Sequence, residues 1–276
     1  MKKNLLAQPF LKWAGGKRQL LPELNKYIPL KYKTYYEPFV GAGAFLFDLQ
    51  PKKAVINDIN SELINCYNVI KNSLDDLVED LKRHEISSDY YYNIRELDRK
   101  PEFNELSAVQ RASRIIYLNK TCFNGLFRVN SQGQYNVPYG NYKNPKVLDE
   151  VVLKAVHNFL NSCDIIISNQ DFEEVVRDAK KGDFIYFDPP YDPVSDSSSF
   201  TGYSLDGFSR DEQRRLKSVF DRLNKKGCFV LLSNSSTDFI KDLYKDYRIE
   251  IVSASRSINS NALKRGKVDE VLVMNY

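Results

Sequence analysis

Histidine and cysteine are scarce in this sequence. Of its 276 residues, two are histidines and four are cysteines. The cysteines are far apart and include no Cys-x-x-Cys pair: Cys66, Cys122, Cys163 and Cys228. This pattern indicates neither a zinc site nor a disulfide framework, so we expect reduced, buried cysteines and no metal. The two histidines, His84 and His157, stand in helix-like stretches, where we expect structural roles rather than a catalytic base.

Long hydrophobic runs are also absent. No apolar stretch approaches the roughly 20 residues that a membrane span needs, and residues 1–9 lack the apolar core of a signal peptide. We therefore expect a cytoplasmic protein that does not enter a membrane. The net charge is only +4, with an isoelectric point near 8.6. Such a charge fits nucleic acid as a partner but does not require it.

Strand-like runs alternate with helical patterns at both ends of the chain. The expected strands are 34–39, 53–57, 164–168, 184–187, 228–232 and 268–274, with helices at about 211–224 and 237–243. This alternation predicts an α/β fold with a doubly wound, mostly parallel sheet. Between the two halves, apolar residues recur at helical spacing after Ser61, whose hydroxyl can cap the first helix. We expect residues 1–61 and 162–276 to form one domain, and residues 62–161 to form an inserted, mainly helical domain.

A glycine-rich turn follows the first strand. In an open α/β sheet, ligands bind beyond the carboxyl ends of the strands, and Pro38-Phe39-Val40-Gly41-Ala42-Gly43 lies at such an end, where glycine lets the backbone approach a ligand. Asp58 ends the neighbouring strand, and its carboxylate can accept both hydroxyls of a ribose. The two features indicate a nucleoside-containing cofactor, although the third glycine of the dinucleotide fingerprint is missing. The alternatives are a tight packing turn and, for Asp58, a helix cap.

The N-terminal stretch Phe10-Leu11-Lys12-Trp13-Ala14-Gly15-Gly16-Lys17-Arg18 combines the only tryptophan with two glycines and three cations. Such a loop can wrap a cofactor with both charge and aromatic surface, but its spacing does not match a phosphate-binding loop. The alternative is a surface turn that a buried tryptophan anchors.

A third motif follows the apolar strand Phe184-Ile185-Tyr186-Phe187, which stops at Asp188-Pro189-Pro190-Tyr191. Because proline has no backbone N–H, this turn presents acceptors, namely a carboxylate and a rigid carbonyl. They suit a planar substrate with an NH₂ group, whose two protons they would accept while Tyr191 stacks on its ring. Since acceptors on both N–H bonds favour attack by the nitrogen, the pattern predicts transfer of a sulfonium methyl to an amine, with both reactants aligned. The alternative is a helix start with proline in its first turn.

Together these motifs resemble a known family. Residues 38–43 followed by 188–191 resemble the amino-methyltransferases that use S-adenosylmethionine. Residues 10–17 resemble, more narrowly, the Dam-like DNA adenine-N6 methyltransferases of the D12 class, which modify GATC. Residues 119–130 and 135–143 resemble the target-recognition hairpin of that family, and the likeness covers nearly the whole chain in the same order. Within the family, the sequence is similar above all to the methyltransferases that accompany GATC-cutting restriction enzymes, the DpnII type.

The resemblance implies a class I, Rossmann-like methyltransferase fold that binds S-adenosylmethionine. Lys17 would meet the carboxylate of the cofactor and Asp58 its ribose, while Asp171 and Phe172 would lie around its adenine. The set implied for the cofactor is Trp13, Ala14, Gly15, Lys17, Phe39, Gly41, Gly43, Asp58, Asp171, Phe172 and Asp188. The implied catalytic residues, which would hold the flipped adenine, are Asp188, Pro189, Pro190 and Tyr191.

A polar, aromatic-rich segment at about 119–145 is expected to form the recognition hairpin. Extruding a base costs a few kcal/mol, and Phe123 can wedge into the base stack. Arg128 can make a bidentate contact to guanine, and Leu126 can touch a thymine methyl. In the family, the residue that matches Lys12 reads a guanine. The set implied for DNA recognition is Lys12, Phe123, Asn124, Leu126, Arg128, Asn130, Pro138 and Tyr142, while an aromatic-packed β-hairpin is the alternative by composition alone.

Further contacts to DNA are expected elsewhere. Asn141 stands where some relatives carry a basic residue, so Lys143 or Lys146 would supply affinity for the backbone. Residues 195–208 are expected to be mobile and to become ordered over bound DNA. A basic cluster near the end is expected to contact phosphates, with a solvated hairpin as the alternative: Arg256, Lys264, Arg265 and Lys267.

The sequence thus predicts a monomeric, site-specific DNA adenine methyltransferase that acts on double-stranded GATC after base flipping. A cognate restriction endonuclease is its expected functional partner. Two alternatives remain: methylation of RNA or another planar amine, and a non-catalytic DNA-binding module that needs neither Asp58 nor residues 188–191.

Overall fold

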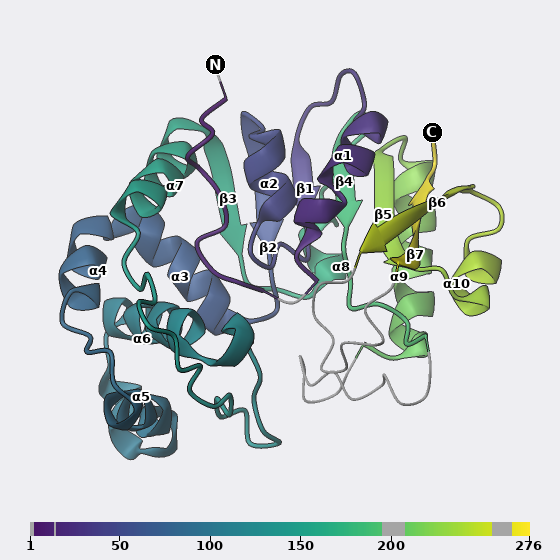
Figure 1. The fold of residues 1–276 in the computed structure, drawn as a ribbon. Helices are drawn as coiled ribbons and strands as arrows, with labels where there is room; N and C mark the ends of the chain where they lie inside the picture. Colours follow the sequence, from purple (N-terminus) through teal and green to yellow (C-terminus); the bar gives the residue numbers. More distant parts are fainter. Residues whose placement is uncertain (1–2, 14, 195–207, 256–266) are drawn as a thin grey trace.

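A seven-stranded sheet forms the centre of the computed structural model, which describes residues 3–13, 15–194, 208–255 and 267–276 (Figure 1). The strand order is β3-β2-β1-β4-β5-β7-β6. The strands are β1 (Tyr35–Glu37), β2 (Lys53–Asn57), β3 (Asp164–Ser168), β4 (Phe184–Phe187), β5 (Phe229–Ser235), β6 (Arg248–Ser255) and β7 (Lys267–Met274). Neighbours from β3 to β5 are parallel, and β7 is antiparallel to both β5 and β6. The predicted doubly wound, mostly parallel sheet is confirmed.

Both faces of the sheet are apolar because helices cover both. On one face, Tyr35 and Tyr186 join a core built with α1 (Leu21–Leu24), α2 (Ala44–Leu49), α3 (Ser61–Asn72), α4 (Leu74–Leu81), α5 (Ser88–Arg95), α6 (Ala108–Thr121) and α7 (Glu150–Ser162). On the other face, Tyr36 and Phe187 join a core built with α8 (Phe172–Val175), α9 (Arg210–Lys225) and α10 (Asp238–Leu243). Adjacent strand residues point to opposite faces, which is why Tyr35 and Tyr36 enter different cores.

The helices α3 to α7 fall between β2 and β3 in the sequence. α3 and α7 both contact β3, so this segment packs directly on the sheet. Figure 1 shows α4, α5 and α6 at the lower left, on the side of the sheet to which the β3 arrow points. The division into domains at residues 62–161 stays a prediction.

Two local features differ from what the sequence indicated. α3 begins at Ser61, but Asn60 is its cap, because Asn60 is extended and its Oδ1 accepts a hydrogen bond from the Leu63 N–H at 2.9 Å. Ser61 itself already lies in the first turn. The second feature is β6, which was not expected. It is an edge strand whose residues alternate between charged and apolar over Arg248–Glu250, a weak signal in so short a stretch.

The cysteines and histidines lie in packed parts of the structure. Three cysteines are buried as expected, whereas Cys163 is only partly buried because it follows the end of α7 at the start of β3. The ring nitrogens of His84 lie 3.0 Å from the Tyr90 hydroxyl and 2.9 Å from the Ser113 hydroxyl. His157 Nδ1 lies 2.8 Å from the Ile70 carbonyl. Among the described residues, no helix is both long and apolar enough to cross a bilayer.

Candidate active site

The loops after β1, β2 and β4 meet at the carboxyl end of the sheet, which we call the carboxyl edge. These three parallel strands are neighbours in the order β2-β1-β4, so their carboxyl ends lie side by side. The glycine turn, Asp58 and Asp188 follow them in turn. The structure therefore brings together three motifs that are up to 150 residues apart in the sequence.

Asp188 is the polar centre of this edge. It follows β4, which is fully buried, and its own side chain is 17% exposed. Its Oδ1 lies 2.9 Å from Lys17 Nζ and accepts a hydrogen bond from the Ser233 hydroxyl at 2.8 Å. Burial raises the pKa of Asp188 above its usual range, and the Lys17 charge and the two hydrogen bonds oppose that rise.

The prolines after Asp188 form an extended turn. Residues 188–194 contain no helix, so the alternative of a helix start is not observed there. Pro190 is exposed, and its carbonyl accepts a hydrogen bond from Gln213 Nε2 at 2.9 Å. No donor among the described residues reaches the Pro189 carbonyl. Pro189 itself is buried, so its carbonyl is a buried acceptor beside Asp188.

Tyr191 contacts one partner through its hydroxyl and another over its ring. Its hydroxyl donates to Glu270 Oε2 on β7 at 3.0 Å, and Lys17 Nζ lies 4.4 Å from the ring centroid. Glu270 is buried, and its carboxylate with that of Asp188 adds to the burial that raises the pKa of the Tyr191 phenol well above 10.0. The phenol therefore stays neutral and keeps donating to Glu270.

The glycine turn is joined to Asp58 by a backbone hydrogen bond. The Gly41 N–H donates to Asp58 Oδ2 at 3.0 Å, and the Asn60 N–H donates to Oδ1 at 2.9 Å. Burial raises the pKa of Asp58 to about 6, against the effect of these two donors. Gly41 and Gly43 have φ of +50° and +73°, conformations that favour glycine. A Cβ on Gly41 would lie 3.1 Å from Trp13 Cδ1, so the Trp13 ring covers this turn.

The N-terminal stretch connects the glycine turn to the hairpin. Trp13 stacks on Phe127 with 4.7 Å between ring centroids, and Lys17 begins the 3₁₀ helix η1 (Lys17–Gln19). Lys17 Nζ also donates to the Gly15 carbonyl at 2.7 Å, where Gly15 has φ of +72°. Ala14 lies outside the described residues.

Asp171 and Phe172 are placed after β3, at the start of α8. The Asp171 carboxylate caps α8 and accepts two hydrogen bonds from Arg215, at 2.7 and 3.1 Å. Burial works against these contacts, but they hold the pKa of Asp171 below its usual value. Phe172 is buried, 5.4 Å from the Phe39 ring and 4.3 Å below the Arg215 guanidinium. These residues line the same edge as Asp58 but already have protein partners.

Sequence reasoning did not identify Ser233, Glu270 or Arg215. Ser233 and Glu270 are polar residues inside the apolar strands β5 and β7, and a buried polar group in a strand indicates a partner. That signal was present in the sequence. Arg215 lies 44 residues after Asp171 on a solvated helix, and no local pattern distinguishes it from its charged neighbours.

After α6 the chain folds back on itself, and this hairpin begins later than residue 119, where the predicted recognition hairpin was expected to start. Residues 119–121 belong to the last turn of α6, and bridges pair Cys122 with Tyr139 and Val129 with Tyr135. Phe123 is 52% exposed, and its N–H donates to the Pro138 carbonyl at 2.8 Å.

Two exposed groups stand out at this hairpin. Asn124 has φ of +57°, uncommon for a residue other than glycine. Arg128 is exposed, and its guanidinium donates to the Asn136 side chain at 2.7 Å and to its carbonyl at 3.0 Å.

Lys12 lies beside this hairpin although it comes from the N-terminal stretch. Its backbone exchanges two hydrogen bonds with the Asn119 amide, and its side chain passes so close to Gly125 that a Cβ there would lie 2.3 Å from Lys12 Cδ. Lys12 Nζ lies 5.5 Å from the Tyr142 ring. Leu126 is partly buried behind the turn, and the Asn130 side chain organises the hairpin tip through Gln132 and Gln134.

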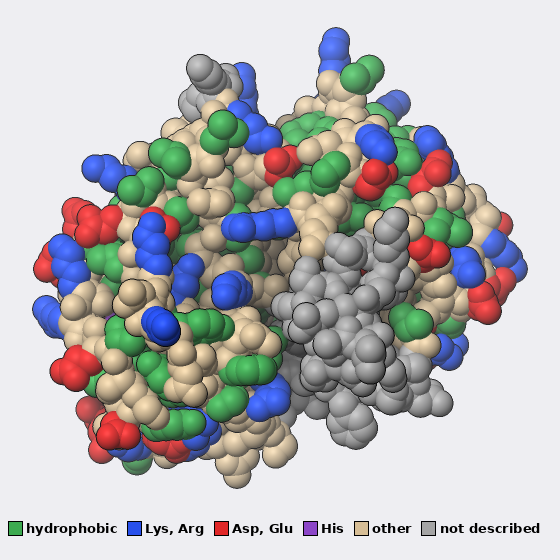
Figure 2. Space-filling model, viewed as in Figure 1, with side chains coloured by type: hydrophobic (Ala, Val, Ile, Leu, Met, Phe, Trp, Pro, Cys, Tyr) green, Lys and Arg blue, Asp and Glu red, His purple; other side chains and the backbone are tan. Residues whose placement is uncertain are grey.

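Figure 2 shows Lys and Arg side chains spread over the face of the molecule at its lower left, with acidic side chains mostly at its rim. Lys143 and Lys146 are exposed after the hairpin, and Lys146 pairs with Asp149 at 2.7 Å. Residues 195–207, Arg256, Lys264 and Arg265 lie outside the described residues, and the side chain of Lys267 is likewise not described.

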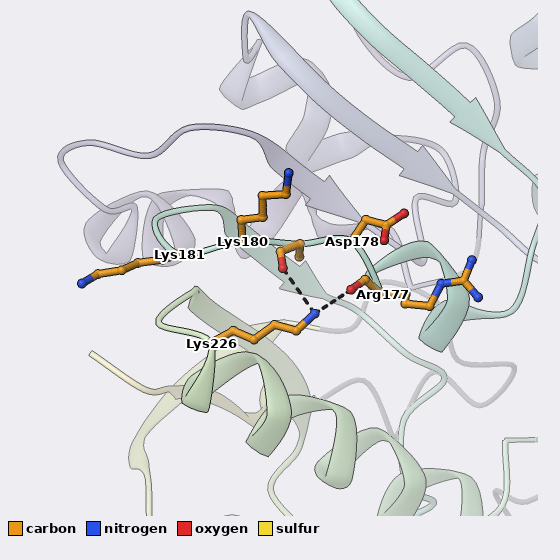
Figure 3. A pocket seen from close by; sticks show the side chains of 6 residues that line it. Arg177, Asp178, Lys180, Lys181 and Lys226 are labelled. Atoms are coloured by element: carbon orange, nitrogen blue, oxygen red, sulfur yellow. Dashed lines mark hydrogen bonds between the residues drawn. The ribbon is translucent and has the colours of Figure 1, made fainter.

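A hollow of about 420 Å³ lies at the opposite, amino-terminal end of the strands (Figure 3). Lys226 Nζ donates there to the carbonyls of Arg177 and Ala179, at 2.6 and 3.3 Å. Lys180 and Lys181 point away from one another rather than toward a common centre. We assign this hollow no role in catalysis. No group of three or more His, Cys, Asp or Glu able to hold a metal occurs among the described residues.

The strand order, together with the motifs at the carboxyl ends of the strands, defines a class I methyltransferase of the Rossmann-like type. In this class a glycine turn, an acidic residue and a second acidic turn follow adjacent strands. The chain belongs to the D12 class N6 adenine-specific DNA methyltransferase family, which matches residues 13–258. Membership excludes the non-catalytic alternative and favours DNA over RNA as the substrate. It also implies the use of S-adenosylmethionine.

Relatives of known name agree with this family. The chain is 48% identical to the type II methyltransferase M1.LlaDCHI of Lactococcus lactis subsp. cremoris, over 100% of this chain and 98% of that protein. It is 44% identical to the type II methyltransferase M.MjaIII of Methanocaldococcus jannaschii, over 98% and 99% of the two chains. It is 35% identical to a DNA adenine methylase of Haemophilus influenzae, over 99% and 96%. The protein is therefore an adenine-specific DNA methyltransferase.

Proposed function

We propose that this methyltransferase acts on the adenine of double-stranded GATC, taking the methyl group from S-adenosylmethionine after the base has left the helix. One observation carries the proposal: the Asp188 turn stands at the carboxyl edge of the sheet, with its carboxylate 17% exposed and Pro190 exposed beside it. A corner of this kind is open to a base, whereas a fully buried one would not be.

The residues at this edge fit the cofactor. Asp58 offers a carboxylate to a ribose, and the positive-φ glycines at 41 and 43 remove side chains from the turn above it. Lys17, which lies beside Asp188, offers a positive charge to the carboxylate of the cofactor. S-adenosylmethionine, when bound, supplies the electrophilic methyl group of a sulfonium. Trp13 and Lys17 would then close the N-terminal side of the site.

At the corner itself, the protein holds the amine rather than attacking it. Asp188 and the Pro189 carbonyl would accept hydrogen bonds from the two N–H groups of the amine, while the Tyr191 ring would stack on the base. The bound cofactor would supply the methyl group: the N–CH₃ bond would form as the S–CH₃ bond broke, the sulfur would keep that electron pair, and the nitrogen would lose one proton to solvent. Acceptors placed where positive charge develops lower the barrier to this step, and alignment of the two reactants lowers it further.

The hairpin supports recognition of the duplex. Phe123 is exposed and can fill the space that a base leaves, while Arg128 is exposed and can read a guanine in the major groove. Lys12 lies against Gly125 of this hairpin, which supports a second contact to guanine. Residues 62–161 would form the recognition domain.

We further propose a role in protection. Two relatives are named type II methyltransferases, which supports a function beside a cognate restriction endonuclease. We expect this function in the cytoplasm, with the methyltransferase acting as a monomer.

Transfer of labelled methyl groups tests the proposed specificity. The protein is incubated with labelled S-adenosylmethionine and one of three substrates: a GATC duplex, a duplex with the same bases permuted, or a double-stranded RNA of matched sequence. We expect label on the GATC duplex only. Equal labelling of the permuted duplex would refute the GATC specificity, and labelling of RNA alone would refute the substrate class.

A further inference from the structure

A buried pair of hydroxyls lies behind Asp188. Ser233 is on β5 and Tyr186 on β4, and both side chains are 0% exposed. The Ser233 hydroxyl donates to Asp188 Oδ1 at 2.8 Å, and the hydroxyls of Tyr186 and Ser233 lie 2.9 Å apart. Parallel pairing of β4 with β5 brings them together, although they are 47 residues apart in the sequence.

The direction of these hydrogen bonds follows from the groups themselves. An ionised carboxylate can only accept, so Ser233 must use its single proton on Asp188. Tyr186 must then donate to the Ser233 oxygen. Burial and the nearby Asp188 charge raise the pKa of Tyr186 well above 10.0, so its proton stays in place. The chain therefore runs one way, from Tyr186 through Ser233 to Asp188.

The two oxygens of Asp188 consequently differ. Oδ1 receives the Ser233 hydrogen bond and the 2.9 Å contact from Lys17, while among the described residues no hydrogen bond to Oδ2 is observed. We propose that Ser233, backed by Tyr186, is a positioning residue that fixes the Asp188 carboxylate so that Oδ2 faces the amine of the target adenine. The inference rests on the proposed function, because it presumes that Asp188 accepts a hydrogen bond from that amine. Neither hydroxyl touches the substrate.

Loss of Ser233 should slow methyl transfer without weakening the binding of the substrates. Without Ser233 the carboxylate keeps Lys17 but can rotate, so the amine meets a displaced acceptor. A displacement of about 1 Å near the reacting atoms can cost up to roughly 10²-fold in rate. Binding of the cofactor and the duplex uses other groups and should persist.

The experiment compares matched pairs of buried hydroxyl variants. Ser233→Ala and Tyr186→Phe alter the chain behind Asp188. Ser113→Ala and Tyr117→Phe are the controls, because Ser113 and Tyr117 are also 0% exposed and hydrogen-bonded, to His84 at 2.9 Å and to the Glu85 carbonyl at 2.9 Å. For each variant, the single-turnover rate of methyl transfer to a GATC duplex is measured at saturating cofactor and DNA. Affinities for S-adenosylhomocysteine and for the duplex are measured in parallel.

We expect Ser233→Ala to slow transfer by roughly 10- to 100-fold, with both affinities within about twofold of wild type. Tyr186→Phe should cause a smaller loss, since Ser233 still donates. The double variant should be no slower than Ser233→Ala, because residues in one chain are not additive. It also removes both polar groups, which leaves no buried hydroxyl unpaired and guards against a variant that fails to fold.

A pH profile separates positioning from general structure. The titratable groups near this corner are Lys17 from η1, Glu37 from β1, Tyr186 from β4, Tyr191 after β4 and Glu270 from β7, and Ser233→Ala leaves all five in place. Loss of the Ser233 donor removes a contact that stabilises the ionised carboxylate, so the acid limb of the rate profile should move to higher pH. The Ser113→Ala profile should match wild type.

Three results would overturn this inference: an unchanged transfer rate in Ser233→Ala, a loss explained wholly by weaker binding, or losses in Ser233→Ala and Tyr186→Phe that multiply in the double variant. They differ from a failure of the proposed function, which would appear as no methyl transfer to the GATC duplex by the wild-type protein.

Discussion

The turn at Asp188 is held by side chains from other elements, whereas the hairpin over residues 122–139 combines such side-chain contacts with hydrogen bonds along its own backbone. Ser233, Gln213 and Glu270 contact the turn from three other elements. In the hairpin, Phe123 bonds to the Pro138 carbonyl and Asn136 to the Arg128 carbonyl, within the same loop. The first arrangement fixes atoms for chemistry, and the second presents a surface to a long partner.

This difference predicts how each region responds to change. A catalytic turn supported by buried polar contacts should lose rate when one contact is lost, while its fold and binding persist. A recognition loop with exposed tips should lose discrimination while the chemistry continues at other sequences. Trp13 links the glycine turn to the hairpin, because it covers Gly41 and stacks on Phe127.

The largest effect should come from Asp188→Ala. This change removes the carboxylate that would accept a hydrogen bond from the amine. We therefore expect the rate of methyl transfer to fall by about 10²–10³-fold or more, with duplex binding retained. Single-turnover labelling and a gel-shift assay measure the two quantities. Asp164→Ala is the control, because Asp164 is exposed at the amino end of β3, where its carboxylate pairs with Lys53 at the surface. Full methylation by Asp188→Ala would remove the proposed mechanism.

Arg128→Ala should have the next largest effect. Loss of one bidentate contact to a base costs about 1–3 kcal/mol of discrimination. Transfer to the GATC duplex should fall accordingly, while transfer to a duplex altered at the guanine changes little. Competition between the two duplexes measures the ratio. Arg177→Ala, at the opposite end of the sheet (Figure 3), should leave the ratio as in wild type. An unchanged ratio in Arg128→Ala would assign Arg128 to the phosphate backbone or to structure.

Acidity should act on the cofactor side of the site. The pKa of Asp58 is raised to about 6 by burial, so the carboxylate gains a proton as the pH falls through that value. A protonated Asp58 is a poor acceptor of hydrogen bonds from the ribose hydroxyls. The affinity for S-adenosylhomocysteine should therefore fall by at most about tenfold for each pH unit below this pKa. Titration calorimetry from about pH 8 to 5 measures the slope. Asp58→Asn should bind weakly and lose this slope; an identical slope in the variant would contradict the assignment.

The smallest effect concerns the helical segment. Burial lowers the pKa of His84 to about 4, below that of the unfolded chain. The unfolded state therefore binds the proton first, and stability is lost as the pH falls from about 6.5 toward 4, by at most about 1.4 kcal/mol for each pH unit. Urea unfolding of wild type and His84→Gln over this range isolates the term. A loss of equal size in His84→Gln would assign it to other groups.

Much of the sheet could be predicted from the sequence because its strands are short apolar runs with clear ends. The residues Gly41, Asp58 and Asp188 could be predicted as one site because parallel strands place their carboxyl ends together. Ser233, Glu270 and Arg215 could not be assigned in the same way, since their partners depend on side-chain contacts across 45, 79 and 44 residues. β6 was missed because an edge strand needs only one buried face, and so carries a weak pattern.

Protection of plasmid DNA tests the central claim most directly. A plasmid with GATC sites is incubated with the protein and S-adenosylmethionine, then digested with a GATC nuclease that adenine methylation blocks. The account predicts full protection by the wild-type protein and none by Asp188→Ala at equal bound protein. A plasmid that stays cleavable after treatment with the wild-type protein, or one that Asp188→Ala protects equally well, would contradict it.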